Sequence, residues 1–297
     1  MKQLHLKEAV DRMLSELSGI NRASQNTIDA YSRDMSDFIY FCDKKEITLI
    51  SRVTEKNIRH FVISLSEKGV SKSTISRKLS TLRHLFNFAL RNDIIEKNPI
   101  SKIPNPKVRR KLPEIINLDS FLEIYRLVDE KGDNSANQVK TIFELLYGCA
   151  LRVSELCSLN IEDIDLHGMS VRVFGKGSKV RIVPIGSKSL TIIKTFIDSK
   201  KRVVQKQPLF EDDSGNRITR HKVYHIVKHY LGKVTDIDKK SPHILRHSAA
   251  THMLDRDADI MAVKEILGHE NLSTTQIYTH VSVERLKQSY KKAHPKS

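Results

Sequence analysis

The 297-residue sequence predicts a mainly α-helical protein of the α+β class, with two domains and one small antiparallel β-sheet. Three observations indicate this fold class: helical periodicity through the first hundred residues, a proline-rich basic segment after them, and two short β-type runs within a second helical region. A chain of this length can bury two separate cores. We therefore expect a helical domain over 1–105, a linker over 106–113 and a mostly helical domain containing the sheet over 114–297.

Two apolar stripes with a spacing of three to four residues define helices in the first domain. The stripes consist of Ile28, Tyr31, Met35, Phe38, Ile39 and Cys42, and of Ile75, Leu79, Leu82, Leu85, Phe86 and Ala89. Basic residues lie between the members of the second stripe: Lys72, Arg77, Lys78, Arg83 and His84. Taken alone, this basic face is most simply a solvated one, and the alternative is a face that contacts a polyanion.

Prolines surround the short basic run 107–111 on both sides. Pro104, Pro106 and Pro113 each lack a backbone donor and favour extended geometry in the residue before them. The segment is therefore predicted to be a linker and not a helix.

The second domain is predicted to begin with a helix that opens at Leu118 and a second helix that runs to about Tyr147, with Gly148 just beyond its end. The β-type runs 169–174 and 180–185 flank 175–179 and predict a hairpin. Helices are expected again at about 188–200 and 218–231.

The charge balance indicates a polyanionic partner. The net charge is +16 and the isoelectric point is near 9.7. Four positive charges and no acid fall within 106–113. The three cysteines form no Cys-x-x-Cys pair, which fits a reducing cytoplasm and argues against a disulfide framework or a zinc site. The absence of an apolar signal core or an 18-residue apolar run predicts a soluble, cytoplasmic protein.

The most informative motif is an ordered set of basic residues that ends in a phenol. Its members are Arg152, Lys176, His243, Arg246, His269 and Tyr278. A phenol is a poor nucleophile at neutral pH, so a reacting tyrosine needs cations around its target and a route for protons. Ser241 and Pro242 predict a helix start that places His243 in the first turn, with Arg246 on the same face.

Each part of the motif also has a simpler interpretation. Ser-Pro helix starts are common structural features, and most tyrosines are packing residues. Lys179 is an alternative to Lys176. The pair His243 and His247 is spaced like a zinc-protease helix, but Ile244 stands where such a helix carries its glutamate.

The ordered set resembles the tyrosine recombinase (phage integrase) family, and within it the Xer type. The similarity extends from about residue 5 to the end, and it is strongest at 241–247 and 272–280. The resemblance implies site-specific DNA recombination through a 3′-phosphotyrosyl intermediate and a Holliday junction, within a tetramer, without metal, ATP or another cofactor. It implies chromosome-dimer resolution at cell division, beside a second Xer-type recombinase and possible control by a DNA translocase.

The resemblance also assigns roles. Tyr278 attacks phosphorus, Arg152 and Arg246 hold the non-bridging oxygens, and Lys176 protonates the 5′ oxygen. His243 is the general acid/base, and His269 hydrogen-bonds the phosphate. Glu155 is expected to orient a catalytic side chain. The DNA contacts expected in the first domain and linker are Lys72, Arg77, Arg83, Lys107, Arg109, Arg110 and Lys111.

Three other functions would account for parts of this pattern. A mobile-element integrase shares the chemistry, and a type IB topoisomerase shares the active site without needing four subunits. A non-enzymatic DNA-binding protein would not require Lys176, His243 and Tyr278 together. After the tyrosine, an apolar stripe that includes Leu286 and Tyr290 predicts a short helix. We expect this helix to dock on a neighbouring subunit, with packing on its own domain as the alternative.

Overall fold

Both predicted stripes of the first hundred residues lie on helices; the second is fully buried, and of the first Met35, Phe38 and Cys42 are buried. The computed structural model describes residues 4–19, 23–107, 114–131, 135–175, 180–200, 206–268, 290 and 293–294. The chain divides into two compact units, Met1–Lys111 and Leu112–Ser297. The predicted linker spans this boundary, and its residues 108–113 lie outside the described ranges.

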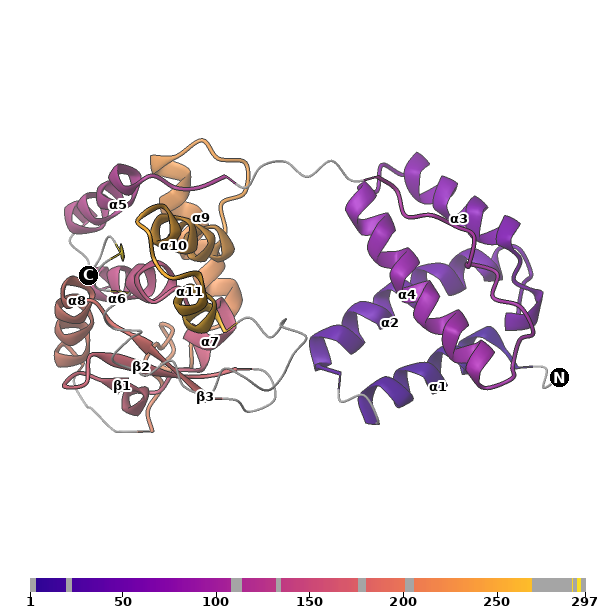
Figure 1. The fold of residues 1–297 in the computed structure, drawn as a ribbon, viewed down its shortest axis with the longest axis horizontal. Coiled ribbons are helices and arrows are strands. Elements are labelled where there is room, and N and C mark those ends of the chain that lie inside the picture. The colour runs from indigo at the N-terminus through magenta and orange to yellow at the C-terminus, as the bar shows by residue number, and fades with distance from the viewer. Residues whose placement is uncertain are drawn as a thin grey trace. The chain divides into compact units, whose positions relative to one another are not determined.

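The first unit is helical (Figure 1). Its helices are α1 (Leu6–Gly19), α2 (Gln25–Asp43), α3 (Glu55–Glu67) and α4 (Lys72–Arg91). Helix α4 packs against the other three, and every member of its predicted stripe is buried. Ser24 caps α2, and Thr54 forms a capping box with Asn57 at the start of α3.

The second unit surrounds a larger core with helices and a sheet. Its helices are α5 (Leu118–Lys131), α6 (Ala136–Phe143), α7 (Val153–Ser158), α8 (Ser187–Asp198), α9 (Arg220–Val234), α10 (Pro242–Asp255) and α11 (Ile260–Leu267). Helix α11 packs against α10 on one side and against strand β3 on another. No helix in the described ranges is both long and apolar enough to cross a bilayer.

The sheet has the order β1-β2-β3 and is antiparallel, with β1 (Ile164–Asp165), β2 (Ser170–Phe174) and β3 (Val180–Pro184). Val171 lies opposite Val183 and both are buried, whereas Phe174 lies opposite Val180 and both are exposed. The predicted hairpin strands are thus present, and 176–179 of the connecting turn lie outside the described ranges. Strand β1 has only two residues, so no alternation predicted it.

The prediction for Gly148 is wrong in an instructive way. Helix α6 continues into a π-helical turn, Glu144–Gly148, that includes this glycine. The left-handed residue is Ala150, with φ 50°. A Cβ atom on Gly148 would lie 2.9 Å from the Ser189 hydroxyl oxygen and 3.0 Å from a Glu144 carboxylate oxygen. The glycine is therefore needed for close packing and not for a positive φ.

Candidate active site

Arg152 occupies the N-cap position of α7, and its side chain remains about one-third exposed (35%). Its backbone N–H donates to Glu155 Oε2 (2.7 Å) and its Nη1 to Glu155 Oε1 (2.7 Å). Its Nη2 donates to the carbonyl of Gly268 (2.9 Å). Arg152 is thus fixed on two sides and still has donor groups that can face a ligand.

Arg246 lies on α10 and is almost fully buried. Its Nη1 donates to the Ala150 carbonyl (2.6 Å), and its Nη2 donates to the Leu267 carbonyl. Its Nη1 is 3.8 Å from Glu155 Oε2. Burial lowers the pKa of Arg246 to about 10, and the nearby charge of Arg152 acts in the same direction. This cation is held at a free-energy cost that an anionic ligand would relieve.

Glu155 connects the two predicted arginines, in agreement with the orienting role expected for it. Arg181 of β3 donates to both of its oxygens (2.8 and 2.9 Å), and sequence reasoning had not singled out Arg181. Burial acts to raise the pKa of Glu155, but hydrogen bonds from Arg181 and Arg152 outweigh it and the pKa lies below its usual value. Among the ion pairs of the described residues, Glu155 is the only carboxylate that these arginines contact. Three guanidinium groups and one carboxylate leave a net charge of +2.

His243 lies in the first turn of α10, as predicted. Pro242 is the first helical residue, and Ser241 is the N-cap residue, although its side chain makes no capping hydrogen bond. The His243 side chain is exposed, whereas Arg246 points into the protein. One helix thus carries an accessible imidazole and a buried guanidinium three residues apart.

Three of the six predicted catalytic residues have no described position. Lys176, His269 and Tyr278, and also the alternative Lys179, lie outside the described ranges. Gly268 is described, and it ends α11 in the left-handed conformation (φ 59°), which glycine adopts without strain. The structure therefore brings together Arg152 and Arg246, with His243 on the same helix as Arg246.

The predicted DNA-contact residues have different surroundings. Lys72 and Lys107 are exposed, whereas Arg83 donates to the carbonyl of Ile103 and the side chain of Asn105 (both 2.7 Å). Arg77 is half-exposed and forms an ion pair with Asp34. Arg109, Arg110 and Lys111 lie outside the described ranges.

Two features of the basic surface differ from expectation. Lys78 is not on the solvated face, because it is buried against Asp34 and Asp37. Helix α9 was predicted only as a helix, yet it carries four lysines and arginines, three histidines and no acid. Its Arg220, Lys222 and Lys228 are exposed. A count of charge within 220–234 could have found this second basic surface.

Other groups in the described ranges fit nucleophilic chemistry poorly. All three cysteines are free and buried, and burial raises the pKa of Cys157 to about 11.

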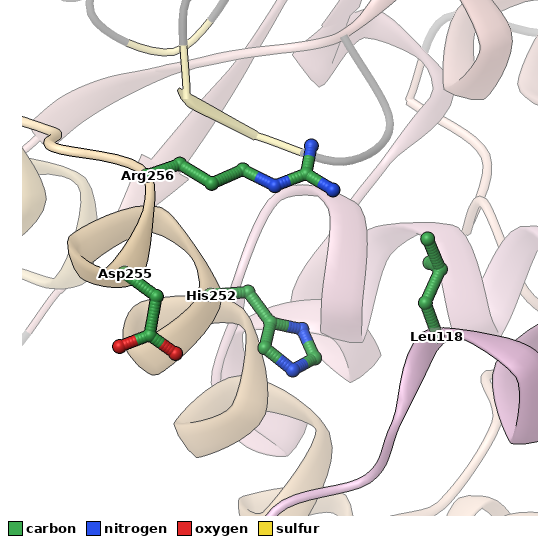
Figure 2. A pocket seen from close by; sticks show the side chains of 4 residues that line it. All are labelled: Leu118, His252, Asp255 and Arg256. Carbon is green, nitrogen blue, oxygen red and sulfur yellow. The ribbon is translucent and has the colours of Figure 1, made fainter.

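A pocket between α5 and α10 is lined by Leu118, His252, Asp255 and Arg256, where His252 and Arg256 extend toward Leu118 (Figure 2). Of the predicted catalytic residues that the structure describes, Arg152, His243 and Arg246, none lines it. The arginine site is instead partly open at Arg152, as a large substrate requires.

The phage integrase family profile matches residues 116–285, and the profile of the phage integrase N-terminal SAM-like domain matches residues 10–93. The chain belongs to the phage integrase family. It is 37% identical over 279 residues to tyrosine recombinase XerD of Staphylococcus haemolyticus, covering 92% of this chain and 94% of that one. It is 38% identical over 283 residues to tyrosine recombinase XerC of Thermodesulfovibrio yellowstonii, covering 92% of each. The predicted Xer type is thus confirmed, and the likeness to XerD is shared with XerC.

Solved structures agree with this assignment. The Tn1549 transposon integrase in complex with circular intermediate DNA has a TM-score of 0.69 at 20% identity, covering 93% of this chain and 97% of that one. A lambda integrase dimer bound to a core site has a TM-score of 0.70 at 16% identity, covering 94% and 100%. These likenesses confirm the predicted fold class. The family profile and the Xer relatives make the protein a tyrosine site-specific recombinase.

Proposed function

We propose that this recombinase cleaves and rejoins duplex DNA at Tyr278, on a phosphate held by Arg152 and Arg246. The observation that carries the proposal is the net positive charge of the partly open site around Glu155. A phosphodiester carries one negative charge, and more charge develops on its oxygens as the fifth bond to phosphorus forms. Guanidinium groups donate paired hydrogen bonds to such oxygens.

The proposed step balances its bonds and protons. The Tyr278 oxygen forms a bond to phosphorus and the bond to the 5′ oxygen breaks, which leaves a 3′-phosphotyrosyl linkage. His243 takes the phenolic proton, and Lys176 supplies a proton to the 5′ oxygen. His269 donates a hydrogen bond to the phosphate. The linkage conserves the bond energy, so rejoining needs no ATP, and the arginines perform the neutralisation that Mg²⁺ performs in other phosphoryl-transfer enzymes.

The other tyrosines support Tyr278 by their surroundings. Tyr125 donates to Glu144, Tyr147 bonds to His252 and Tyr290 donates to the Gly148 carbonyl. Burial raises the pKa of each of these three phenols. Tyr230 is also buried, and of the remaining three tyrosines two lie in the first unit and one on the exposed side of α9. Tyr278 is the better candidate because it follows the arginine site in the order typical of the family.

Two basic surfaces and the linker would hold the duplex. The first unit contributes Lys72, Arg77 and Arg83 as the N-terminal DNA-binding domain, and 106–113 would follow the phosphate backbone between the units. The basic face of α9 is a further candidate for a DNA contact. Such surfaces release counterions from DNA, so affinity should fall steeply with salt.

We further propose that four subunits exchange strands through a Holliday junction, with a second Xer-type recombinase as partner and a DNA translocase as a possible regulator. The names XerD and XerC among the relatives favour chromosome-dimer resolution in the cytoplasm over a mobile-element integrase. Tyr290 is buried and donates a hydrogen bond to Gly148 of its own unit. This contact supports the alternative for the tail, which is packing on its own domain. Docking of the tail on a neighbour remains a prediction for the assembled tetramer.

The deciding experiment is formation of a covalent adduct. The wild-type protein should attach to a nicked suicide substrate and shift on a denaturing gel, in excess EDTA as well as with Mg²⁺. Tyr278→Phe should form no adduct but should bind the same duplex with unchanged affinity, because it loses one hydroxyl and no charge. A shifted band with the phenylalanine variant, or an adduct that requires divalent metal, would contradict the proposal.

A further inference from the structure

Within the described residues, the side chain of Arg181 makes more hydrogen bonds than the side chain of either predicted catalytic arginine. Its Nη1 and Nη2 donate to the two oxygens of Glu155 (2.8 and 2.9 Å), and its Nε donates to the carbonyl of Ile266 (3.0 Å). The side chain is only 11% exposed, compared with 35% for Arg152. Arg181 therefore faces the protein with all three of its nitrogens, whereas Arg152 retains an open side.

The end of α11 shows what these bonds achieve. Three consecutive carbonyls there, those of Ile266, Leu267 and Gly268, accept hydrogen bonds from Arg181, Arg246 and Arg152 respectively. The last carbonyls of a helix lack partners within the helix and carry partial negative charge. Three cations from β3, α10 and α7 therefore meet at one helix end. Arg181 is the member of this set whose side chain donates to both oxygens of Glu155, whereas the side chain of Arg152 donates only to Oε1.

Gly268 shows how closely Arg181 lies against this end. A Cβ atom on Gly268 would come within 3.1 Å of the Cδ, Nε and Cζ atoms of Arg181. The arginine side chain thus lies directly against the backbone of the residue that precedes His269 in the sequence. A shift of Arg181 would therefore change the surroundings of Arg152, Arg246 and this backbone together.

We propose that Arg181 is a positioning residue for the recombination reaction: it holds Glu155 and the end of α11 in the arrangement that presents Arg152 and Arg246 to the scissile phosphate. This inference rests on the proposed function of those two arginines. Arg181 acts through its neighbours and does not contact the DNA. A planar guanidinium can bridge Glu155 and a carbonyl at once, whereas a lysine ammonium is a point charge that cannot make the same set of bonds. Charge alone should therefore not restore its role.

The test compares Arg181→Met and Arg181→Lys with Arg172→Met as the matched control. Arg172 lies on the neighbouring strand, is about half-exposed and pairs with Asp163, away from Glu155. Cleavage is measured in single turnover at saturating protein on a suicide duplex, and duplex affinity and thermal unfolding are measured in parallel. Both Arg181 variants should bind DNA as the wild type does but cleave about 10- to 100-fold more slowly, since small misplacements of catalytic groups have effects of this size. The control should cleave at the wild-type rate.

A second substrate separates positioning from a general loss of structure. A methylphosphonate at the scissile position lacks one charged oxygen, so it needs less neutralisation by Arg152 and Arg246. The defect of each Arg181 variant, relative to wild type, should shrink on this substrate. A defect of equal size on both substrates would assign Arg181 a merely structural role and overturn the inference.

The remaining outcomes are also decisive. If Arg181→Met does not fold, Arg181→Lys, which preserves the charge, is used for the same comparison. Cleavage at the wild-type rate by every Arg181 variant that folds would overturn the inference. Arg152→Ala serves as the reference for the proposed function. If Arg152→Ala abolishes adduct formation while the Arg181 variants react normally, only the positioning role fails. If the wild-type protein forms no adduct, the proposed function itself fails.

Discussion

Each unit of the molecule contains a buried carboxylate that is paired with two or more basic side chains, but the two clusters differ in net charge. In the first unit, Asp34 accepts from Arg77, Lys78 and Thr81, and Lys78 also pairs with Asp37. Two carboxylates there balance two cations. In the second unit, the single carboxylate of Glu155 pairs with three arginines, Arg152, Arg181 and Arg246.

The difference indicates two separate uses of buried charge. A balanced cluster satisfies its own members, so its removal should affect the fold and not the chemistry. In an unbalanced cluster the like charges repel one another, and a bound anion reduces this repulsion. Such an excess of one charge is typical of a functional site. Glu155 offsets part of the excess positive charge of the three arginines. A phosphate bound at the open side of Arg152 would offset more of it.

The largest expected effect distinguishes the clusters by cleavage rate. Arg246→Ala should reduce single-turnover cleavage by about 10²- to 10³-fold, because it removes one of the groups that we propose neutralise the transition state. Thr81→Val removes a hydrogen bond to Asp34 in the balanced cluster and should leave the rate unchanged. A similar rate loss in both variants would end the distinction between the two clusters.

The next effect distinguishes them by stability. Asp34→Ala should lower the free energy of unfolding by about 3 kcal/mol, since it leaves the buried Lys78 with only the more exposed Asp37. Asp34→Ala combined with Lys78→Met should recover much of that loss, because no buried charge is then left without its partner. Denaturant titration measures both values, and a double variant no more stable than the single one would contradict the charge-balance argument.

A smaller effect should come from an added anion. Sulfate at about ten times its dissociation constant should stabilise the second unit by about 1.4 kcal/mol, because a ligand that binds only the folded state shifts the unfolding equilibrium. Scanning calorimetry of the wild type and of Arg246→Ala gives the comparison. An equal shift in the variant would mean that the salt acts without occupying the arginine site.

The smallest effect concerns pH. The folded-state pKa of Glu155 is depressed below its usual value of 4.5, so its contribution to stability is present above that value and is lost as the pH falls through the folded-state pKa. The difference in unfolding free energy between wild type and Glu155→Gln should therefore shrink as the pH falls below 4.5. A difference that stays constant down to the acid limit would show that the carboxylate charge is not what the arginines require.

Much of the fold could be predicted because its signals are local. The stripes that form α2 and α4 repeat with the helical period, and from Val171 to Phe174 strand β2 alternates buried and exposed residues as a half-buried strand does. Gly148 was misplaced because glycine serves two purposes, positive φ and close packing, and only the position of Ser189 decides between them. Residue type alone does not carry that information.

The candidate site, like the fold, could be predicted where its signals lie close together or in a recognisable order along the chain. Arg152, His243 and Arg246 were found through a motif whose order is visible in the chain, and Lys176, His269 and Tyr278 stay predictions from that motif. Arg181 was missed because its partners, Glu155 and Ile266, lie 26 and 85 residues away in the sequence. Lys78 was assigned to the wrong surface for the same reason, since Asp34 lies 44 residues from it.

The last turn of α11 is where this helix would ordinarily begin to fray, because terminal turns have the fewest internal bonds. Here the carbonyls of that turn are also the acceptors that hold three arginines from three other elements. Opening of this one turn would therefore break a hydrogen bond of each of the three arginines at once, and closing it would restore all three bonds. Amide hydrogen exchange at the end of α11 would thus report how often the three arginines are held together, and any contact that stabilises this turn would raise the fraction of molecules in which the proposed phosphate site is formed.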